Sequence, residues 1–477
     1  MPDRSRSLLR HRDFLKLWTG ETISQFGTQI SLLAIPFVAL SVLGATPFQF
    51  GLLTTVEFLP FILFSLPAGA WVDRLRRRPI LIAGDLGRAI SLLSIPIAYE
   101  LHVLSIPQLY VVGFVNGVCT VLFDVAYQSY LPALVDRDQI IDGNSKLEIS
   151  RSAAQIAGPG LAGVIIGIAT APIAIVGDAL SFLASAASVF WIRKPEPPVD
   201  RHVDEVGRPR GSLRQEVASG LRYVLGHPYL RSIAASTGWS NFFDNIAMAA
   251  LFPYMLRVLG LGPAEVGLIF AIGNLGPLVG AFAARPIADR LGVGRTTIAA
   301  MALHGPAFVL VAVAPPENAV PFLIAAVALM GFGGIVYNIN QVSFRQAITA
   351  TGMQGRMNAS MRFIVWGTIP IGSILGGALG STIGLRETIV IGTIGVAFAF
   401  LPLLVGPLKA LRKMPEPASP GTEAMPEAIL VGMAIDEAAE PMGITPLPRP
   451  AQDERVEVGS QIGEGSLDLE LGEPGHD

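Results

Sequence analysis

Three carboxylic acids in this sequence each lie within an apolar run of roughly 20 residues, the length at which a helix crosses a bilayer. They are Glu57, Asp124 and Asp244. A carboxyl group surrounded by apolar groups holds its proton more tightly than one in water, so it can exchange that proton near neutral pH. We interpret the three acids as candidates for proton coupling, and a structural ion pair is the alternative for each.

Polar side chains recur at helical spacing within the same runs. Glu21, Ser24, Gln25 and Thr28 share one helix face, and the four positions 216 residues later are polar again. We expect such faces to line a substrate cavity, although polar contacts that hold helices together are the alternative. The cavity candidates are Glu21, Gln25, Thr28, Asn116, Thr120, Tyr127, Asn241, Tyr337, Asn338 and Gln341.

Basic residues also occur inside the apolar runs. Arg151 and Arg362 each lie about one turn inside a run, and we expect them to be charged partners of acids such as Asp124. Asp85 and Arg88 are one helical turn apart, so we expect them to neutralise each other in a structural pair.

Metal, cofactor and enzyme chemistry find no support in the residue pattern. The single cysteine, Cys119, lies in an apolar run, and the six histidines lack the spacing of metal ligands. The sequence holds no GxxxxGK[ST] motif for nucleotide phosphates. We therefore expect no metal, no cofactor, no nucleic-acid partner and no enzymatic activity.

Composition predicts that these residues are positioned by membrane-spanning helices. Of 477 residues, 51% are hydrophobic and 15% charged, and the mean hydropathy is +0.54. A soluble protein carries about 25% charged residues. We predict an all-α membrane protein with twelve transmembrane helices, placed roughly at 14–43, 48–71, 79–99, 106–132, 147–169, 172–192, 229–258, 264–287, 295–314, 319–344, 357–380 and 387–407.

The distribution of charge predicts orientation and domain limits. With the N-terminus inside, nearly all lysines and arginines near the helix ends fall on the cytoplasmic side, while the outer loops receive only Arg257 and Arg386. We therefore predict a multi-pass protein of the plasma (inner) membrane with both termini cytoplasmic. The predicted parts are an N-terminal six-helix bundle, a cytoplasmic linker, a C-terminal six-helix bundle and a disordered acidic tail, at 1–193, 194–228, 229–413 and 414–477.

A duplicated motif connects the two halves. The stretch "GAWVDRLRRRP" at 69–79 resembles the signature loop of the major facilitator superfamily, and "GAFAARPIADRLGVGR" resembles its second copy. The stretch "AGPGLAG" at 157–163 resembles the Gly-Pro motif of antiporters in that superfamily. The stretches "EFLPFILFSLPAGAWVDRLRRRP" at 57–79 and "FDVAYQSYLPALV" at 123–135 are similar to the branch that holds macrolide-efflux proteins and the enterobactin exporter.

The resemblance implies a fold and a gate. It implies two pseudo-symmetric six-helix bundles with a central cavity, and a cytoplasmic network that latches the bundles in the outward-open state. The gate residues are Gly69, Asp73, Arg74, Arg77, Arg78, Asp289 and Arg290, although anchoring of the loop is an alternative role for the arginines. Gly158, Pro159 and Gly163 are candidates for a helix bend, with close helix packing as the alternative.

These observations predict a proton-coupled secondary active exporter of small amphipathic molecules such as drugs, natural products or siderophores. Its expected partners are the substrate, protons and the lipid bilayer, and we expect a monomer. Two alternatives are open: an importer of an organic anion or sugar with the same fold, and a membrane scaffold or sensor that acts through the acidic tail.

Overall fold

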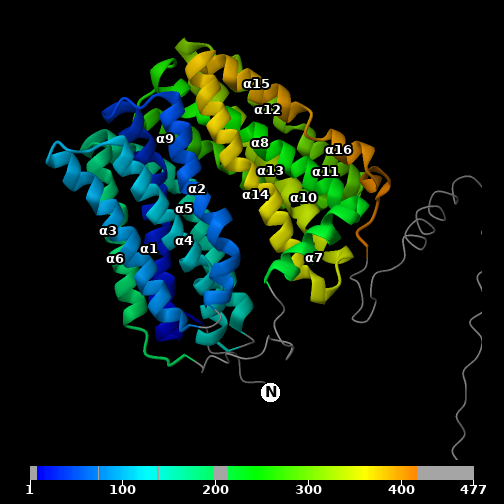
Figure 1. The fold of residues 1–477 in the computed structure, drawn as a ribbon, viewed down its shortest axis with the longest axis horizontal. Helices are drawn as coiled ribbons and strands as arrows, with labels where there is room; N and C mark the ends of the chain where they lie inside the picture. The colour runs from blue at the N-terminus through cyan, green and yellow to red at the C-terminus, as the bar shows by residue number, and fades with distance from the viewer. Residues whose placement is uncertain (1–7, 73–74, 137–138, 197–212, 416–477) are drawn as a thin grey trace, which may run out of the picture. The chain divides into compact units, whose positions relative to one another are not determined.

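The computed structural model describes residues 8–72, 75–136, 139–196 and 213–415. Contacts divide the chain into units of residues 1–423 and 424–477, and only the first contains described residues. Gate residues Asp73 and Arg74, most of the predicted linker and nearly all of the predicted tail lie outside the described residues. The described part consists of helices and irregular segments without a strand, which confirms the all-α prediction (Figure 1).

The first half of the sequence forms six long helices. In order they are α1 (Arg12–Phe37), α2 (Pro47–Val72), α3 (Arg77–Glu100), α4 (Ile106–Leu134), α5 (Ile140–Ala169) and α6 (Ala171–Phe190). A 3-10 turn, η1 (Leu8–Arg10), precedes α1, and a π-helical turn, η2 (Val38–Val42), extends it. Each helix ends within a few residues of a predicted span, except that α5 starts seven residues earlier than expected.

The second half begins with a helix that the sequence did not predict. This helix, α7 (Leu213–Gly226), lies within the predicted linker, and Val224 on it is buried. The helices that follow are α8 (Pro228–Arg257), α9 (Pro263–Gly273), α10 (Leu275–Leu291), α11 (Val293–Ala302), α12 (His304–Ala312), α13 (Ala319–Ile348), α14 (Thr351–Thr382), α15 (Leu385–Ala397) and α16 (Leu401–Val405), with 3-10 turns η4 (Pro316–Asn318) and η5 (Pro407–Ala410).

Three predicted spans of this half are each divided into two helices. The breaks separate α9 from α10, α11 from α12 and α15 from α16. A proline lacks the amide hydrogen that the carbonyl four residues earlier would accept. Pro277 and Pro306 each stand four residues after the last residue of the first helix of the pair, and Pro402 stands five residues after it. The prolines therefore account for the breaks.

Eleven helical segments of the described chain are long and apolar enough to cross a membrane. The predicted span 229–258 is absent from these eleven, although α8 covers it with an unbroken 30-residue helix. Its polar residues, which include Ser236, Ser240, Asn241 and Asp244, lower its hydropathy. The described chain is thus a polytopic helical membrane protein.

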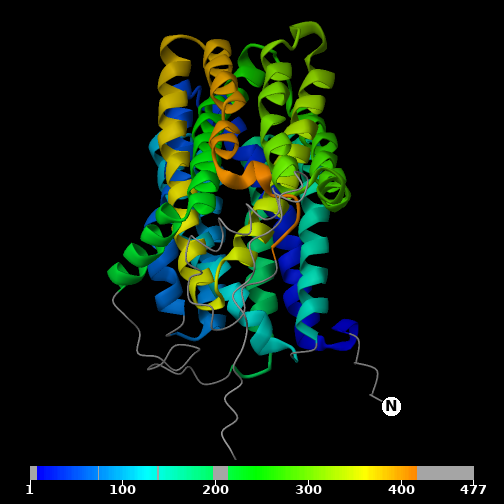
Figure 2. The same cartoon turned by 90° about the vertical axis from the view of Figure 1, so that its right-hand side faces the viewer.

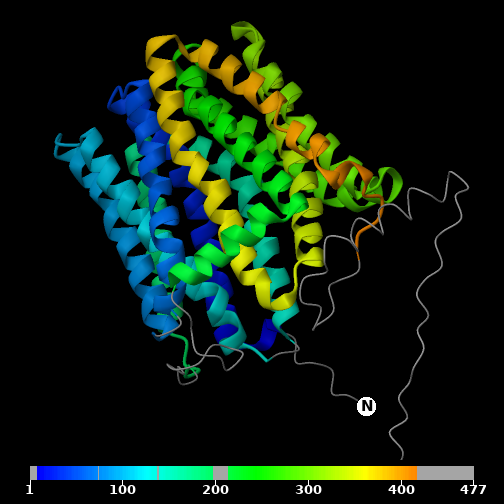
Figure 3. The same cartoon turned by 45° about the vertical axis from the view of Figure 1, so that its right-hand side comes forward.

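The helices pack mainly with others of their own half. In the first half α1 contacts α5 and α6, while α3 and α4 contact each other. In the second half α8 packs on α14 and α15, and α13 contacts α9 to α12. Figures 1 to 3 show the long helices lying side by side. We call the end at which α1 begins the basic end, because most of the arginines gather there, and the opposite end the far end.

Two helix pairs form most of the contact between the halves, and α2 with α8 adds a smaller contact. The two main pairs are α2 with α14 and α5 with α9. Both main contacts involve the portions of these helices nearer the far end, as the individual residues below demonstrate.

Candidate functional site

A cluster of charged residues is buried among α1, α3 and α4. Glu21 on α1 is 8% exposed, and one of its carboxylate oxygens accepts a hydrogen bond of 2.7 Å from Gln25. Its other oxygen has no hydrogen-bond partner among the described residues. Glu21 lies within electrostatic range of Asp85, Arg88 and Asp124. The structure therefore brings a predicted cavity residue together with a predicted proton-coupling residue.

Arg88 is the centre of this cluster. Its guanidinium forms an ion pair of 2.5 Å with Asp85, and both side chains are almost fully buried, which confirms the predicted pair. The guanidinium also lies between the rings of Phe123 and Phe182, at 4.2 and 4.1 Å from their centroids. Cation–π contacts on both faces stabilise a desolvated guanidinium. Arg88 thus remains a fixed positive charge that serves several acids.

Asp124 on α4 is exposed. It lies within electrostatic range of Arg88, Arg151 and Arg362, but among the described residues it forms no ion pair with the latter two. Arg151 instead lies 4.0 Å from Glu148 on its own helix. The expected direct pairing with Asp124 is therefore not formed in this conformation.

Tyr127 lies one turn beyond Asp124 on the same helix. Its hydroxyl is buried without a hydrogen-bond partner in the described part of the chain. The hydroxyl lies within electrostatic range of both Glu21 and Asp124. A phenol can both donate and accept a hydrogen bond, so it is placed to connect the two carboxyl groups.

Glu57 on α2 lies apart from this cluster. It packs against α4, because a Cβ atom added to Gly113 would lie 2.9 Å from Glu57 Cγ. No ionic partner for it is found among the residues described.

Asp244 on α8 has a different set of neighbours. One carboxylate oxygen accepts a hydrogen bond of 2.9 Å from Ser240, and the other is buried without a partner in the described residues. His304, the first residue of α12, lies within electrostatic range of Asp244, and its Nδ1 is likewise unpartnered. The described second half therefore contains an acid and an imidazole within electrostatic range of each other, each with one buried atom that lacks a hydrogen-bond partner.

The remaining cavity candidates form local contacts. Thr237 and Tyr337 join α8 to α13 through their hydroxyls at 2.6 Å, and Asn241 donates to the carbonyl of Val365 on α14 at 3.2 Å. Gln341 donates to Asn338 at 3.0 Å. Thr120 donates to Asn116 at 3.4 Å, a long contact, and Thr28 is half-buried on α1. These bonds fit the alternative of polar contacts between helices as well as a cavity lining.

Small residues let the halves approach near the far end. A Cβ atom added to Gly163 on α5 would lie 3.0 Å from the Cα of Gly267 on α9, and one added to Gly377 on α14 would lie 3.2 Å from the Cα of Gly51 on α2. Gly51 and Gly267 are 216 residues apart, the same offset that relates the polar faces at 21–28 and 237–244. Helix α5 continues through Pro159, whose carbonyl also faces Gly267. Gly158 packs on Gln29 of α1.

An arginine bridges the halves at the far end. Arg257, at the last turn of α8, donates to the carbonyl of Ala45 at 2.6 Å and to that of Leu40 at 3.4 Å. Both carbonyls belong to the segment that follows α1. An arginine at this position ties the two halves together where the π-helical turn leaves backbone acceptors free.

The signature loop at the basic end is organised within one half. The backbone amides of Arg77 and Arg78 donate to Glu196 at 2.8 and 2.6 Å, which caps the N-terminus of α3. The side chain of Arg78 binds the carbonyls of Val189 and Phe190 at the end of α6.

The other gate candidates do not meet this loop among the described contacts. Asp289 and Arg290 on α10 are exposed, and Asp289 lies 3.8 Å from Arg285 on its own helix. Gly69 lies in α2.

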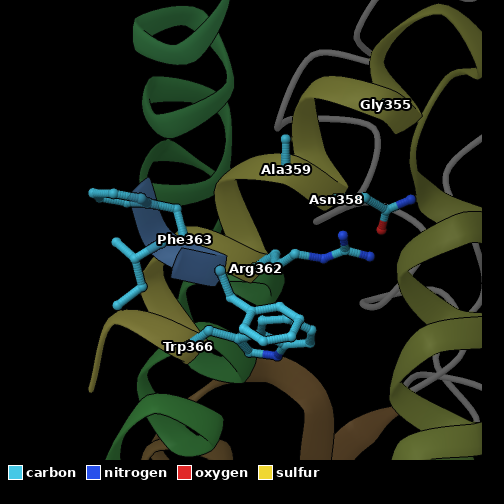
Figure 4. Close-up of a pocket in the computed structure, with 8 residues that line it drawn as sticks. Gly355, Asn358, Ala359, Arg362, Phe363 and Trp366 are labelled. Atoms are coloured by element: carbon cyan, nitrogen blue, oxygen red, sulfur yellow. The ribbon is translucent and has the colours of Figure 1, made fainter. Parts of the chain in front are cut away.

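A cavity of about 220 Å³ lies between α2 and α14. Figure 4 shows Asn358, Arg362 and Trp366 projecting to the same side of α14, as their spacing of four residues requires. The guanidinium of Arg362 lies 5.1 Å from the ring of Trp366. Phe61 and Ile62 of α2 and Phe363 of α14 contribute further walls.

Sequence reasoning missed several of these residues. It read Arg88 only as the partner of Asp85, and it gave no role to His304 or Trp366. Arg257 was noted only as an exception to the charge bias. The arginine in an outer loop and the histidine within an apolar run were visible signals, but their partners come from helices distant in the sequence.

A helical membrane chain in two sets of helices, with buried carboxyl groups and arginines facing the space between them, has the architecture of a membrane transporter. The sequence matches the family described as "Transmembrane secretion effector" over residues 5–445, and the chain belongs to this family of the major facilitator superfamily. It is therefore a multi-pass membrane protein of a bacterial transporter family and not an enzyme.

The chain is similar to two characterised exporters. It is 25% identical over 400 residues to the multidrug efflux pump Tap of Mycolicibacterium fortuitum, covering 79% of this chain and 93% of that protein. It is 22% identical over 426 residues to the enterobactin exporter EntS of Salmonella choleraesuis, covering 87% and 98%. These relatives support membrane transport and export.

Solved structures share the fold. A bacterial homologue of the iron transporter ferroportin in the inward-facing state is 16% identical, covers 84% of this chain and 99% of its own, and has a TM-score of 0.66. The outward-facing state of a bacterial ferroportin homologue has a TM-score of 0.53 at 15% identity, covering 82% and 98%.

Proposed function

We propose that the protein is a proton-coupled exporter of small amphipathic molecules that works by alternating access. Its two six-helix bundles, residues 1–193 and 229–413, rock about the cavity between them, and the linker 194–228 connects them. The protein acts as a monomer in the plasma membrane, with the basic end and both termini in the cytoplasm. The excess of arginine at the basic end supports this orientation.

The contacts between the halves support an inward-facing conformation. Arg257 and the two glycine contacts hold the far end together, whereas Arg78 binds carbonyls of its own half rather than crossing to the other. The higher TM-score with the inward-facing ferroportin homologue is consistent with this. In the outward-facing state, the gate residues of the signature loop and of α10 would close the basic end.

The observation that carries the proton-coupling proposal is the imbalance of charge around Arg88. Four carboxyl groups, those of Glu21, Asp85, Asp124 and Asp178, share electrostatic range with this buried arginine. Asp85 already neutralises Arg88 in the ion pair. An ionised Glu21 has no ionic partner of its own in this buried position, so proton binding to Glu21 relieves its repulsion by Asp85 and Asp124.

Alternating access then exposes this site to the two sides in turn. A proton that enters from outside neutralises the cluster, and its release to the cytoplasm restores the charge. The sequence predicts Glu57, Asp124 and Asp244 as candidates for the residue that carries the proton. The geometry adds Glu21 as a fourth candidate, and Tyr127 lies where it can connect Glu21 to Asp124.

The test is proton release in inside-out vesicles that hold an acidic lumen reported by a quenched dye. Antibiotics, cationic dyes and siderophores are added one at a time. The variants are Glu21→Gln, Glu57→Gln, Asp124→Asn and Asp244→Asn. Asp142→Asn is the matched control, because Asp142 is half-exposed and pairs with Lys146 at the basic end.

We expect a transported compound to cause proton release in the wild type and in the control. At least one of the four acid variants should lose this release while still binding the compound. Release that survives in all four variants would refute the assignment of the proton site but leave export intact. Transport that is unaffected when the pH gradient is collapsed would refute proton coupling itself. Deletion of the tail distinguishes the exporter from the scaffold alternative, because only a scaffold that acts through the tail should lose its function.

A further inference from the structure

The cavity between α2 and α14 begins where the contact between these helices ends. From the far end, Phe48 donates its backbone amide to Ser381 at 2.9 Å, and Thr55 donates to the carbonyl of Pro370 at 3.2 Å. The ring of Phe61 then meets Trp366 edge to face, with centroids 5.7 Å apart. The cavity lies directly on the basic side of this aromatic pair. The cavity is therefore the first pocket on the basic side of the contact between α2 and α14.

The polar group of the cavity is an arginine without an ionic partner. Among the described residues, no carboxylate forms an ion pair with Arg362. Asp124, across the space between the halves, is within electrostatic range only. Stacking on Trp366 fixes the plane of the guanidinium and leaves its N–H groups free to donate. Arginine in this state binds a carboxylate through two parallel hydrogen bonds and repels cations.

The walls and the size restrict what fits. Phe61, Trp366 and Phe363 provide aromatic surface, and flat rings pack on such surfaces edge to face or offset. Pockets that enclose a whole drug-sized ligand measure about 300–1,000 Å³. At about 220 Å³ the cavity takes one ring system of a larger molecule rather than the whole of it.

We propose that this cavity is a loading site that binds the negatively charged aromatic end of an exported molecule, such as an aryl carboxylate. Arg362 binds the anionic group, Asn358 offers a second polar contact, and Phe61 with Trp366 holds the ring. The proposal rests on the proposed function only for the direction of transport, because binding at this cavity is measured without transport.

The experiment compares two probes that share one ring system. They are 2-naphthoate, which is anionic, and 2-naphthamide, which is neutral. Binding of each is measured by equilibrium dialysis against the full chain in phosphatidylcholine nanodiscs, with empty nanodiscs as background. The variants are Arg362→Gln, Arg362→Lys and Trp366→Leu. Arg295→Gln is the matched control, because Arg295 is an exposed arginine on α11 that does not line the cavity.

We expect the wild type and Arg295→Gln to bind 2-naphthoate roughly tenfold or more tightly than 2-naphthamide, the effect of one charge-assisted contact. Arg362→Gln should abolish the preference without weakening binding of the amide, and Arg362→Lys should restore part of it. Trp366→Leu should weaken both probes. A preference that persists in Arg362→Gln, equal binding of the two probes, or no binding of either by a folded wild type would each overturn the proposal.

The outcome is separable from that of the proposed function. If 2-naphthoate binds as expected but no compound drives proton release in the vesicle assay, the loading site stands and the export mechanism fails. If proton release is found with cationic compounds while the naphthoate preference is absent, the exporter stands and this site fails.

Discussion

Removal of the far-end arginine should shift the balance between the two conformations. Arg257 makes the one short hydrogen bond that joins α8 to the segment after α1, at 2.6 Å to the carbonyl of Ala45. The contact with Leu40 at 3.4 Å is longer than an ordinary hydrogen bond and adds little. In the proposed alternating-access cycle the halves separate at this end in the outward-facing state, so the bond would exist only in the state with the far end closed.

The size of the effect follows from one charged hydrogen bond. Such bonds contribute about 1.5–3 kcal/mol. The Arg257 side chain is exposed, so we take the lower value, and about 1.4 kcal/mol corresponds to a factor of ten in an equilibrium constant. Arg257→Gln should therefore raise the ratio of far-end-open to far-end-closed molecules roughly tenfold.

The assay is a distance measurement between two spin labels by pulsed electron paramagnetic resonance. The native Cys119 is replaced by alanine, and cysteines are introduced at Val103, between α3 and α4, and at Glu317, between α12 and α13. Arg386→Gln is the control, because Arg386 is also at the far end but donates to Ala312 within its own half, at 3.1 Å.

We expect a longer distance component to grow in Arg257→Gln and to stay unchanged in Arg386→Gln. An identical distance distribution in Arg257→Gln and the wild type would refute the role of Arg257 as a latch. An equal shift in both variants would instead assign the effect to loss of positive charge at this end.

Three other variants test separate parts of the fold. Gly163→Val should increase the same long distance, because its side chain would collide with Gly267, whereas Gly167→Val, which faces open space, should not. Arg88→Leu leaves Asp85 buried and unpaired, so it should destabilise the protein by about 3–5 kcal/mol in a thermal unfolding measurement, with much of the loss recovered when Asp85→Leu is added. Deletion of residues 416–477 should leave transport intact, and its loss would favour the scaffold alternative.

The existence and limits of most helices were predictable from the sequence, because apolar runs of membrane length have few other folds. The span expected at 106–132 is α4, Ile106–Leu134. The division of later spans was not predicted, although its cause was visible in the sequence. Pro277 and Pro306 lack the amide hydrogen that the carbonyl one turn earlier would accept, so the helix ends there. Helix α7 was missed although Val217, Leu221 and Val224 recur at helical spacing, because a short amphipathic helix lacks the long apolar run by which the membrane spans were predicted.

The members of the candidate site were predictable one by one, but their grouping was not. Helical spacing placed Glu21 on a polar face and Asp124 on another, and it contained no information on which helices are neighbours. The contact between α3 and α4 brings Arg88 toward Asp124, and Glu21 on α1 completes the group. The 216-residue offset relates one pair of positions that contact the opposite half. Gly51 packs against Gly377, and Gly267 packs against Gly163 in the equivalent way.

Helix α8 illustrates why function weakens the sequence signal for structure. A helix in lipid needs apolar side chains, but a helix that borders a pathway for polar molecules needs hydroxyl and carboxyl groups. Within α8 Ser240 donates to one oxygen of Asp244, and Thr237 and Asn241 bind α13 and α14. The cost of polarity is thus offset by tertiary contacts that hydropathy does not measure. The predicted span that falls short of the hydropathy of a membrane helix is therefore the one whose polar groups are held in contacts with neighbouring helices.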